Sequence, residues 1–198
     1  MKHFIVNIGC EYGSGGPDIG RMISESLGIP FYDRDLVDQV VEKLGVDRDL
    51  VEKADSGEEN VKYEFDTTFG PRYANLTNRV IYTQFEVIHK LAAKSSCVII
   101  GRCSNYILKD RDDCLNIFVY APDEFKVKHI MEQKGISEKE AKKLVKYNDG
   151  MLKSRYEYMT SSDMRDCRTR HMMIDSSILG LEKTAKYIMQ LIDLRFED

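Results

Sequence analysis

The feature that most constrains the fold is a short apolar segment that runs into a glycine-rich turn and then into a helix. Residues 3–8 are mostly apolar and β-branched, which predicts a buried strand that stops at Gly9. The turn spans residues 9–17 and contains four glycines. Apolar residues then recur at helical spacing until Gly28 ends the helix, namely Ile19, Met22, Ile23 and Leu27. A first strand that leads through such a turn into a first helix is where phosphate-binding loops occur.

The glycine-rich turn is predicted to bind phosphate through its backbone. Glycine lets the chain curve around an anion, and the N–H groups at a helix start carry partial positive charge. The standard G-x-x-x-x-G-K-[ST] pattern is not met, because Gly16 stands at the lysine position and Pro17 at the serine or threonine position. A tight turn without a ligand is therefore the alternative that these residues leave open. The candidate donor-phosphate residues are Gly13, Ser14, Gly15 and Gly16.

Further along the chain, short apolar runs alternate with helical patterns. Strands are expected over residues 31–32, 97–101, 115–120 and 171–174, and helices over 35–44, 47–54, 76–93, 123–134, 137–160 and 181–194. Ser137 and Glu140 fit a capping box. Residues 55–74 are polar and form the best candidate for a mobile connection, and residues 161–170 are polar and basic. Buried strands separated by helices predict an α/β fold, with a parallel sheet, helices on both faces and ligands beyond the carboxyl ends of the strands.

Length and charge limit the class of protein and the class of partner. The chain has 198 residues, enough for one domain with a small inserted lobe, and an apolar fraction of 42% excludes a disordered chain. The net charge of −4 argues against wholesale binding of nucleic acid or anionic membrane. No apolar run reaches the roughly 20 residues of a membrane span, and the first residues turn polar too soon for a signal peptide.

Cysteine and histidine usage points to a reducing compartment and to no metal centre. The five cysteines contain no C-x-x-C pair, which argues against a disulfide framework or a zinc site. The four histidines lack the spacing of metal-binding or triad motifs. We therefore expect a cytoplasmic protein.

Four blocks of sequence carry a resemblance to a known family. They are residues 9–20, 27–33, 98–108 and 175–183, and the third contains the pair Gly101-Arg102. In this combination the chain resembles the cytidylate kinase-like family, a bacterial branch of the P-loop nucleoside monophosphate kinases, over nearly its whole length. The resemblance implies a three-layer P-loop NTPase fold of the nucleoside monophosphate kinase type, with residues 1–198 as a single kinase-like domain. It also implies an acceptor-binding insertion at about 34–94 and a lid at about 150–170.

The resemblance further implies an activity and gives roles to individual residues. The reaction is ATP-dependent phosphoryl transfer to a small-molecule acceptor, with Mg²⁺ as cofactor and a nucleoside monophosphate such as CMP as the candidate. The glycine-rich turn holds the donor phosphates. Arg102 matches an arginine that clamps the acceptor phosphate, and Asp33 matches the aspartate at the mouth of the acceptor site. No metal ligand is assigned, because Ser14 and Glu11 can either reach magnesium or brace the turn.

Departures from the family pattern bear on catalysis. The loop lysine is absent, as in the whole branch, and Cys10 and Pro17 stand where the branch usually has arginine. Ile100 replaces the acidic residue of cytidylate kinases. A missing positive charge at the transferring phosphate weakens catalysis unless another cation replaces it. A catalytically inactive nucleotide-binding or sensory protein that retains the kinase fold is therefore the alternative function. The candidate catalytic cations are Arg155, Lys153 and Arg21, although such residues are also typical of solvated helix faces.

Overall fold

The computed structural model describes residues 2–33, 35–56, 62–65 and 72–197. The chain divides into two compact units, one made of Met1–Asp33 with Ala92–Asp198 and the other of Arg34–Leu91. The first unit contains the sheet, the glycine-rich turn and every site residue predicted above. No helix within the described ranges is both long and apolar enough to cross a membrane.

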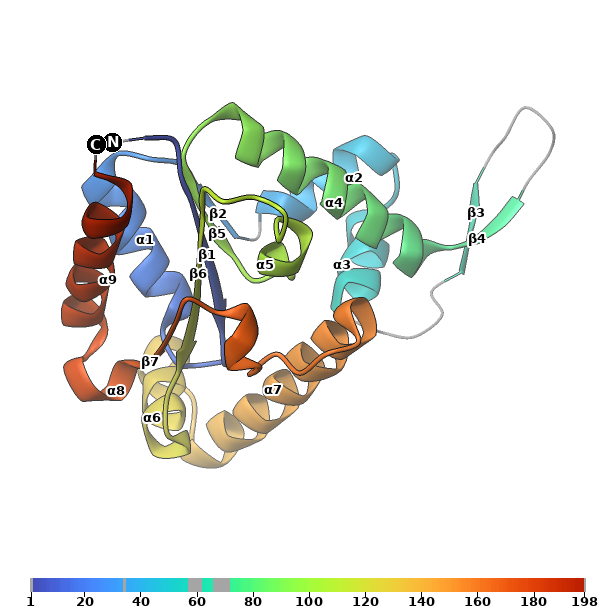
Figure 1. Cartoon of the computed structure of the whole chain (residues 1–198). Helices are drawn as coiled ribbons and strands as arrows, with labels where there is room; N and C mark the ends of the chain where they lie inside the picture. The colour runs from blue at the N-terminus through green and yellow to red at the C-terminus, as the bar shows by residue number, and fades with distance from the viewer. Residues whose placement is uncertain (1, 34, 57–61, 66–71, 198) are drawn as a thin grey trace. The chain divides into compact units, whose positions relative to one another are not determined.

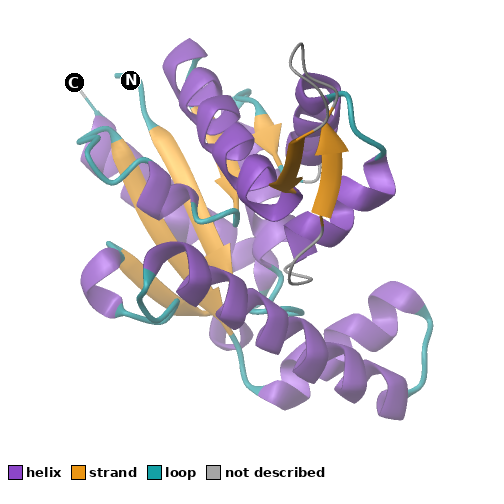
Figure 2. Ribbon diagram, turned by 90° about the vertical axis from the view of Figure 1, so that its right-hand side faces the viewer, coloured by secondary structure: helices purple, strands orange, loops and turns teal. Residues whose placement is uncertain are grey.

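A five-stranded parallel sheet forms the centre of the first unit (Figures 1 and 2). The strand order is β2-β5-β1-β6-β7, with β1 at Ile5–Cys10, β2 at Phe31–Tyr32, β5 at Cys97–Ile100, β6 at Cys114–Tyr120 and β7 at Met172–Asp175. β1 lies in the middle, where Ile8 pairs with Ile100 of β5 and with Ile117 of β6. The predicted parallel sheet is thereby confirmed. Because all five strands run the same way, their carboxyl ends meet at one edge.

Helices cover both faces of this sheet, which confirms the three-layer fold. α1 (Gly16–Leu27) and α9 (Leu181–Phe196) lie side by side on one face (Figure 1), where one apolar core joins both helices to β1, β5 and β6. Side chains alternate along a strand, so Phe118 of β6 faces the other way. There it packs with Cys103 and with Tyr156 of α7 (Glu138–Thr160). Each buried apolar side chain contributes roughly 1.5–3 kcal/mol, so these cores hold the helices on the sheet.

The other helices of the first unit are α5 (Ser104–Ile107), α6 (Asp123–Lys134) and α8 (Ser176–Leu179), and a 3-10 turn covers Cys167–Thr169. α6 packs on α7 through an apolar cluster that includes Val127 and Val145. The predicted capping box of α7 is confirmed, since Ser137 Oγ accepts the N–H of Glu140 and Glu140 Oε2 accepts the N–H of Ser137. The three short elements are not among the predicted ones, because three or four residues show no periodicity.

The second unit contains α2 (Asp35–Leu44), α3 (Arg48–Ser56), β3 (Lys62–Phe65), β4 (Arg72–Asn75) and most of α4 (Leu76–Lys94). β3 and β4 pair in antiparallel fashion, with Lys62 opposite Asn75. The sequence analysis expects no strand over residues 55–74, so β3 and β4 are additional elements. The alternation of polar and aromatic residues in β3 is only four residues long, too short to identify a strand. Residues 57–61 and 66–71 lie outside the described residues, and the predicted mobility stays a prediction.

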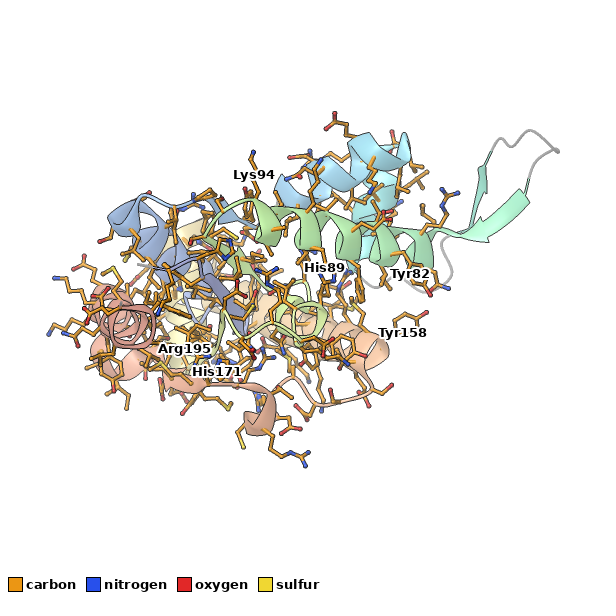
Figure 3. All side chains as sticks on the ribbon, turned by 45° about the horizontal axis from the view of Figure 1, so that its top comes forward. Tyr82, His89, Lys94, Tyr158, His171 and Arg195 are labelled. Atoms are coloured by element: carbon orange, nitrogen blue, oxygen red, sulfur yellow. The ribbon has the colours of Figure 1, made fainter. Side chains whose placement is uncertain are left out.

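His171 joins β7 to β6 through two hydrogen bonds. Its N–H donates to Asn116 O (2.7 Å), and its Nδ1 accepts the N–H of Asn116 (2.9 Å). Partial burial, and then the charge of Arg195, lower the pKa of His171 below the ordinary 6.5; Figure 3 labels both side chains. The unfolded chain therefore takes up a proton more readily than the folded one. It follows that this residue stabilises the fold at neutral pH and that the contribution is lost as the pH falls below about 6.5.

We predict that His171→Asn makes folding less sensitive to acid. The asparagine Oδ1 can accept the same N–H of Asn116 but does not titrate. Melting temperatures measured between about pH 7.5 and about pH 5.5 should fall less in the variant than in the wild type. Equal falls would show that another group controls the acid response.

Candidate active site

The glycine-rich turn leads from the carboxyl end of β1 into α1. Gly13 and Gly15 have φ angles of +84° and +82°, which residues with a side chain rarely adopt. Pro17 lies in the first turn of α1, where its missing N–H breaks no helical hydrogen bond. The N–H groups of Gly13, Gly15 and Gly16 find no acceptor within the described part of the chain. Three of the four predicted donor-phosphate residues therefore offer an N–H group to an anion.

The polar groups of Ser14 form hydrogen bonds within the turn and to its neighbours. Its N–H donates to Glu11 O (3.2 Å), and its hydroxyl donates to Glu11 O (2.8 Å) and to Val119 O (3.1 Å). Its own carbonyl accepts the hydroxyl of Ser176 (2.6 Å). Of the two roles considered for Ser14, the structure shows the one that braces the turn.

The contact between Cys10 and Gly16 explains why this turn carries no lysine. The standard pattern has its first glycine six positions before the lysine, and Cys10 occupies that position here. A Cβ atom at Gly16 would lie 2.5 Å from Cys10 Cβ and 2.6 Å from Cys10 Sγ, closer than packed atoms approach. The side chain of Cys10 therefore disfavours any side chain at position 16.

The charges of three guanidinium groups act on the buried thiol of Cys103, which follows the carboxyl end of β5. Burial raises the pKa of this thiol to about 11, and the charges of Arg155, Arg170 and Arg102 oppose the rise. The thiol is therefore neutral, and the positive charges around it are not balanced by a thiolate. The cluster brings together Arg102 and Arg155, two of the predicted site residues, and adds Arg170 from the segment before β7.

The chain that carries Arg102 has an uncommon backbone conformation. Gly101, Arg102 and Cys103 have φ angles of +62°, +53° and +53°, so three consecutive residues are left-handed. The turn closes when Ser104 N–H donates to Gly101 O (3.0 Å) and α5 begins. For residues with a side chain this conformation costs about 1–3 kcal/mol each, and it is found mostly at functional sites.

Arg170 is a buried cation with unused hydrogen-bonding capacity. Its relative exposure is 9%, and its guanidinium carbon lies 5.3 Å from the ring centroids of both Phe118 and Tyr156. Nη2 donates to Met164 O (3.1 Å), whereas Nε and Nη1 have no hydrogen-bond partner among the described residues. A Cβ atom at Gly9 would lie 3.3 Å from Nη1, so the guanidinium packs closely against the end of β1.

Burial lowers the pKa values of two of these arginines. The pKa of Arg155 falls to about 10, and that of Arg170 falls for the same reason. Both side chains remain protonated at neutral pH, so the cluster holds desolvated positive charge. Desolvated cations are unfavourable unless an anion compensates them. Arg170, whose Nε and Nη1 have no hydrogen-bond partner among the described residues, thus gives the arginine cluster (Arg102, Arg155 and Arg170) the electrostatic character of an anion-binding site.

A second charged cluster lies beside the glycine-rich turn, around Lys126 of α6. Lys126 Nζ forms ion pairs with Asp149 Oδ2 (2.8 Å), Asp123 Oδ1 (2.9 Å) and Glu11 Oε2 (3.0 Å). The other oxygen of Glu11 pairs with Arg165 (2.5 Å). The sequence analysis misses Lys126, because a single lysine on a helix has no distinguishing signal and Glu11 is 115 positions away.

A cavity of about 700 Å³ along α6 and α7 is lined by Lys126, Asp149 and Arg165 of this second cluster. Two further cavities adjoin the cluster and also border the glycine-rich turn through Glu11. The larger of these two measures about 420 Å³ and is lined by Glu11, Lys126 and Arg165 together with Tyr120 and Asp175 from the ends of β6 and β7. The smaller, of about 230 Å³, is lined by Lys153 among others. Small-molecule ligands bind at this edge of parallel sheets, so both cavities lie where a ligand is expected.

The structure places the remaining predicted residues apart from the arginine cluster. Lys153 lines the smaller cavity, which the turn borders. Arg21 is exposed, and its guanidinium stacks on the ring of Phe31, 4.8 Å from the centroid. Burial raises the pKa of Cys10, at the start of the turn, to about 12, and the charge of Asp33 adds to this rise. Asp33 therefore lies near the start of the turn.

Comparison with known proteins agrees with this fold. The sequence profile of the cytidylate kinase-like family matches residues 5–178, whereas no curated protein sequence matches the chain. An uncharacterized protein from Eubacterium ventriosum has a similar structure, with a TM-score of 0.72, 26% identity and coverage of 96% of this chain and 98% of that one.

Two solved shikimate kinases are more distant. The enzyme from Acinetobacter baumannii, in complex with shikimate, has a TM-score of 0.55 at 16% identity and covers 100% of this chain and 97% of its own. The enzyme from Bacteroides thetaiotaomicron has a TM-score of 0.57 at 11% identity and covers 97% and 99%. At such identities the likeness shows a common fold only.

The contact at Gly16 predicts a specific pattern of stability. Gly16→Ala should destabilise the protein by roughly 1–3 kcal/mol, because the new methyl group meets Cys10. Combining it with Cys10→Gly should recover part of that loss. Gly150→Ala on α7 is the control, since nothing lies within 4 Å of its Cβ position, and it should be neutral or stabilising. Urea unfolding measures all four chains, and a Gly16→Ala chain as stable as wild type would contradict the steric argument.

The burial of Arg170 predicts opposite effects on stability and on anion binding. Arg170→Met removes a desolvated charge and keeps an apolar side chain, so the melting temperature should stay equal or rise. Binding of inorganic phosphate, measured by calorimetry at low salt, should weaken at least about tenfold. Arg168→Met is the matched control, because Arg168 is 86% exposed and paired with Asp166. Unchanged phosphate binding in Arg170→Met would exclude Arg170 from the anion site.

Proposed function

The chain belongs to the cytidylate kinase-like family, and on that premise we propose that it transfers the γ-phosphoryl group of ATP to a small acceptor. A nucleoside monophosphate such as CMP is the candidate acceptor. The single observation that carries the proposal is the arginine cluster, in which the buried Arg170 packs against the end of β1 and Arg102 and Arg155 are half-buried. Phosphoryl transfer asks a protein mainly to position its reactants and to stabilise negative charge. Buried guanidinium groups do both.

Each arginine has a role in this proposal. Arg102 clamps the acceptor phosphate at the end of β5, and Asp33 lies at the mouth of the same site. Arg155, on α7, faces the transferring phosphoryl group. Arg170 binds alongside Arg102 and Arg155. The rings of Phe118 and Tyr156 fix its guanidinium, and its Nε and Nη1 can donate hydrogen bonds to a phosphate. The acceptor-binding role of residues 34–94 and the lid role of residues 150–170 belong to the same proposal.

The donor side relies on the backbone of the turn. The N–H groups of Gly13, Gly15 and Gly16 are the proposed ligands of the ATP phosphates, since they have no acceptor among the described residues. Lys153 stands at the border of the adjoining cavity, where it can meet the same phosphates. Arg21 contributes little to this site while its guanidinium stacks on Phe31.

The described residues do not fit a magnesium site held by the protein. The hydroxyl of Ser14 donates inside the turn, and both carboxylate oxygens of Glu11 form ion pairs. The three carboxylates that do converge, those of Glu11, Asp123 and Asp149, hold the Lys126 ammonium group. Within the described ranges no group of three His, Cys, Asp or Glu side chains could hold a metal ion. We therefore assign no protein ligand to Mg²⁺. The ATP phosphates themselves, which commonly carry the ion with its waters, are its proposed ligands.

A cytoplasmic location is also part of the proposal. Its support is that all five cysteines are free, three of them buried, which suits a compartment that keeps thiols reduced.

The alternative function is a nucleotide-binding or sensory protein that has lost turnover. The observation in its favour is the turn itself, in which Cys10 disfavours a lysine at position 16. The arginine cluster opposes it, because pure nucleotide binding does not need a desolvated cation at the acceptor end. The two functions differ in product formation.

A direct assay separates them. The full chain is incubated with ATP and Mg²⁺ and with CMP, the other nucleoside monophosphates or shikimate, and ADP and phosphorylated acceptor are quantified by chromatography. The proposal expects product from at least one acceptor. Calorimetric ATP binding without product from any acceptor would establish the binding protein instead.

Arg155→Ala tests the catalytic role of the cluster. Positive charge at the migrating phosphoryl group matters most in the transition state, so kcat should fall by on the order of a thousandfold. The affinity for ATP should change by less than about threefold, because the turn already holds the ground-state phosphates. Arg168→Ala, in the 3-10 turn of the proposed lid, is the control and should stay near wild type. A kcat for Arg155→Ala within about threefold of wild type would contradict this role.

A further inference from the structure

Lys126 is a buried ammonium group that touches the phosphate-binding turn from outside it. Its side chain is 3% exposed, and α6 presses directly on the turn. A Cβ atom at Gly13 would lie 2.9 Å from the carbonyl oxygen of Lys126, and His129 Nδ1 lies 2.9 Å from Gly13 O. The position of the ammonium group relative to the turn is therefore fixed by backbone packing.

Asp149 connects this ammonium group to the backbone of the turn. Its Oδ1 accepts the N–H of Tyr12 (2.7 Å), and its Oδ2 accepts from Lys126 Nζ (2.8 Å). A backbone N–H and a lysine ammonium are the two kinds of donor that a phosphate-binding loop offers to a phosphate. The carboxylate of Asp149 thus accepts from both kinds of donor at once.

The three carboxylates around Lys126 are not equivalent. Together they use all three of its N–H donors. Glu11 is 6% exposed and also paired with Arg165, so it is fixed in place. Asp123 is 82% exposed and lies on the same helix as Lys126, three residues before it. Asp149 alone comes from α7 and alone also binds the turn.

We propose that Lys126 supplies the positive charge that a standard loop takes from its own lysine. The Tyr12 N–H and the Lys126 ammonium group form an anion seat, which Asp149 occupies until a donor phosphate displaces it. The inference rests on the proposed function, since it concerns the donor of the same reaction. When a donor phosphate replaces the Asp149 carboxylate, the hydrogen bond between Tyr12 N–H and Asp149 breaks, and with it this contact between α7 and the turn. Lys153, one helical turn after Asp149, lines the same small cavity and gains access to the incoming phosphate.

Binding of inorganic pyrophosphate tests the anion seat without any requirement for turnover. Asp149→Asn keeps an oxygen for the Tyr12 N–H but lowers the competition for Lys126, so calorimetry should show about tenfold tighter pyrophosphate binding. Asp123→Asn is the matched control, because it removes the same charge from the same ammonium group without touching the turn. Its exposed charge is screened, and the pyrophosphate affinity should change by less than about threefold. Equal gains in both variants would overturn the assignment of Asp149.

A double variant tests Lys126 itself. Lys126→Gln combined with Asp149→Asn removes one positive and one negative charge, so the local net charge is unchanged. Its pyrophosphate affinity should fall at least about tenfold below that of Asp149→Asn. An affinity equal to that of Asp149→Asn, in a chain whose circular dichroism matches wild type, would show that Lys126 is only structural. Should the double variant fail to fold, Lys126→Arg with Asp149→Asn replaces it and must retain the tight binding.

These outcomes separate the inference from the proposed function. Phosphoryl transfer by the wild type together with unchanged pyrophosphate binding in Asp149→Asn overturns the anion seat and leaves the kinase. Tightening in Asp149→Asn without transfer to any acceptor supports the anion seat and overturns the kinase.

Discussion

The pairing of β1 with both β5 and β6 is the interaction on which the candidate site depends. It continues past the regular strands, where Gly101 N–H donates to Ile8 O (2.9 Å) and Glu11 N–H donates to Val119 O (3.0 Å). The first bond places the left-handed turn of Arg102 beside the end of β1, and the second anchors the glycine-rich turn to β6. A slip of one residue in either pairing would turn each side chain to the opposite face. The relative placement of the arginine cluster and the turn is thus set by backbone hydrogen bonds.

The site holds its cations in two contrasting ways. Lys126 is surrounded by carboxylates, and its hydrogen bonds to Asp149, Asp123 and Glu11 raise its pKa above the ordinary value despite burial. Arg170 is buried against aromatic rings, and burial lowers its pKa. Its Nε and Nη1 have no hydrogen-bond partner among the residues that the structure describes. An anion can therefore join the arginine cluster directly, whereas at Lys126 it must first replace a carboxylate. In the proposed kinase this difference favours acceptor binding before full engagement of the donor.

The sequence predicts the fold well where elements are long and regular. The parallel sheet and the capping box of α7 follow from apolar periodicity and from the residues Ser137 and Glu140, and both are confirmed. The strands at 62–65 and 72–75 are too short for such a signal. Within the candidate site, the family resemblance singles out Arg102 by its motif and Arg155 by its place in the lid segment, and the roles of both stay predictions. The position of Lys126 could not be predicted, because it depends on how α6 packs over the turn.

The steric exclusion between Cys10 and Gly16 has a consequence for how such a turn can change over time. A lysine introduced at position 16 first would meet the cysteine side chain, so that intermediate is disfavoured. Loss of the cysteine side chain first leaves a small void that the turn can tolerate, and only then does position 16 become open to larger residues. The two substitutions are therefore coupled, and their order matters. The contact between Cys10 and Gly16 thereby favours the order in which Cys10 is replaced first and disfavours the order in which Gly16 is replaced first.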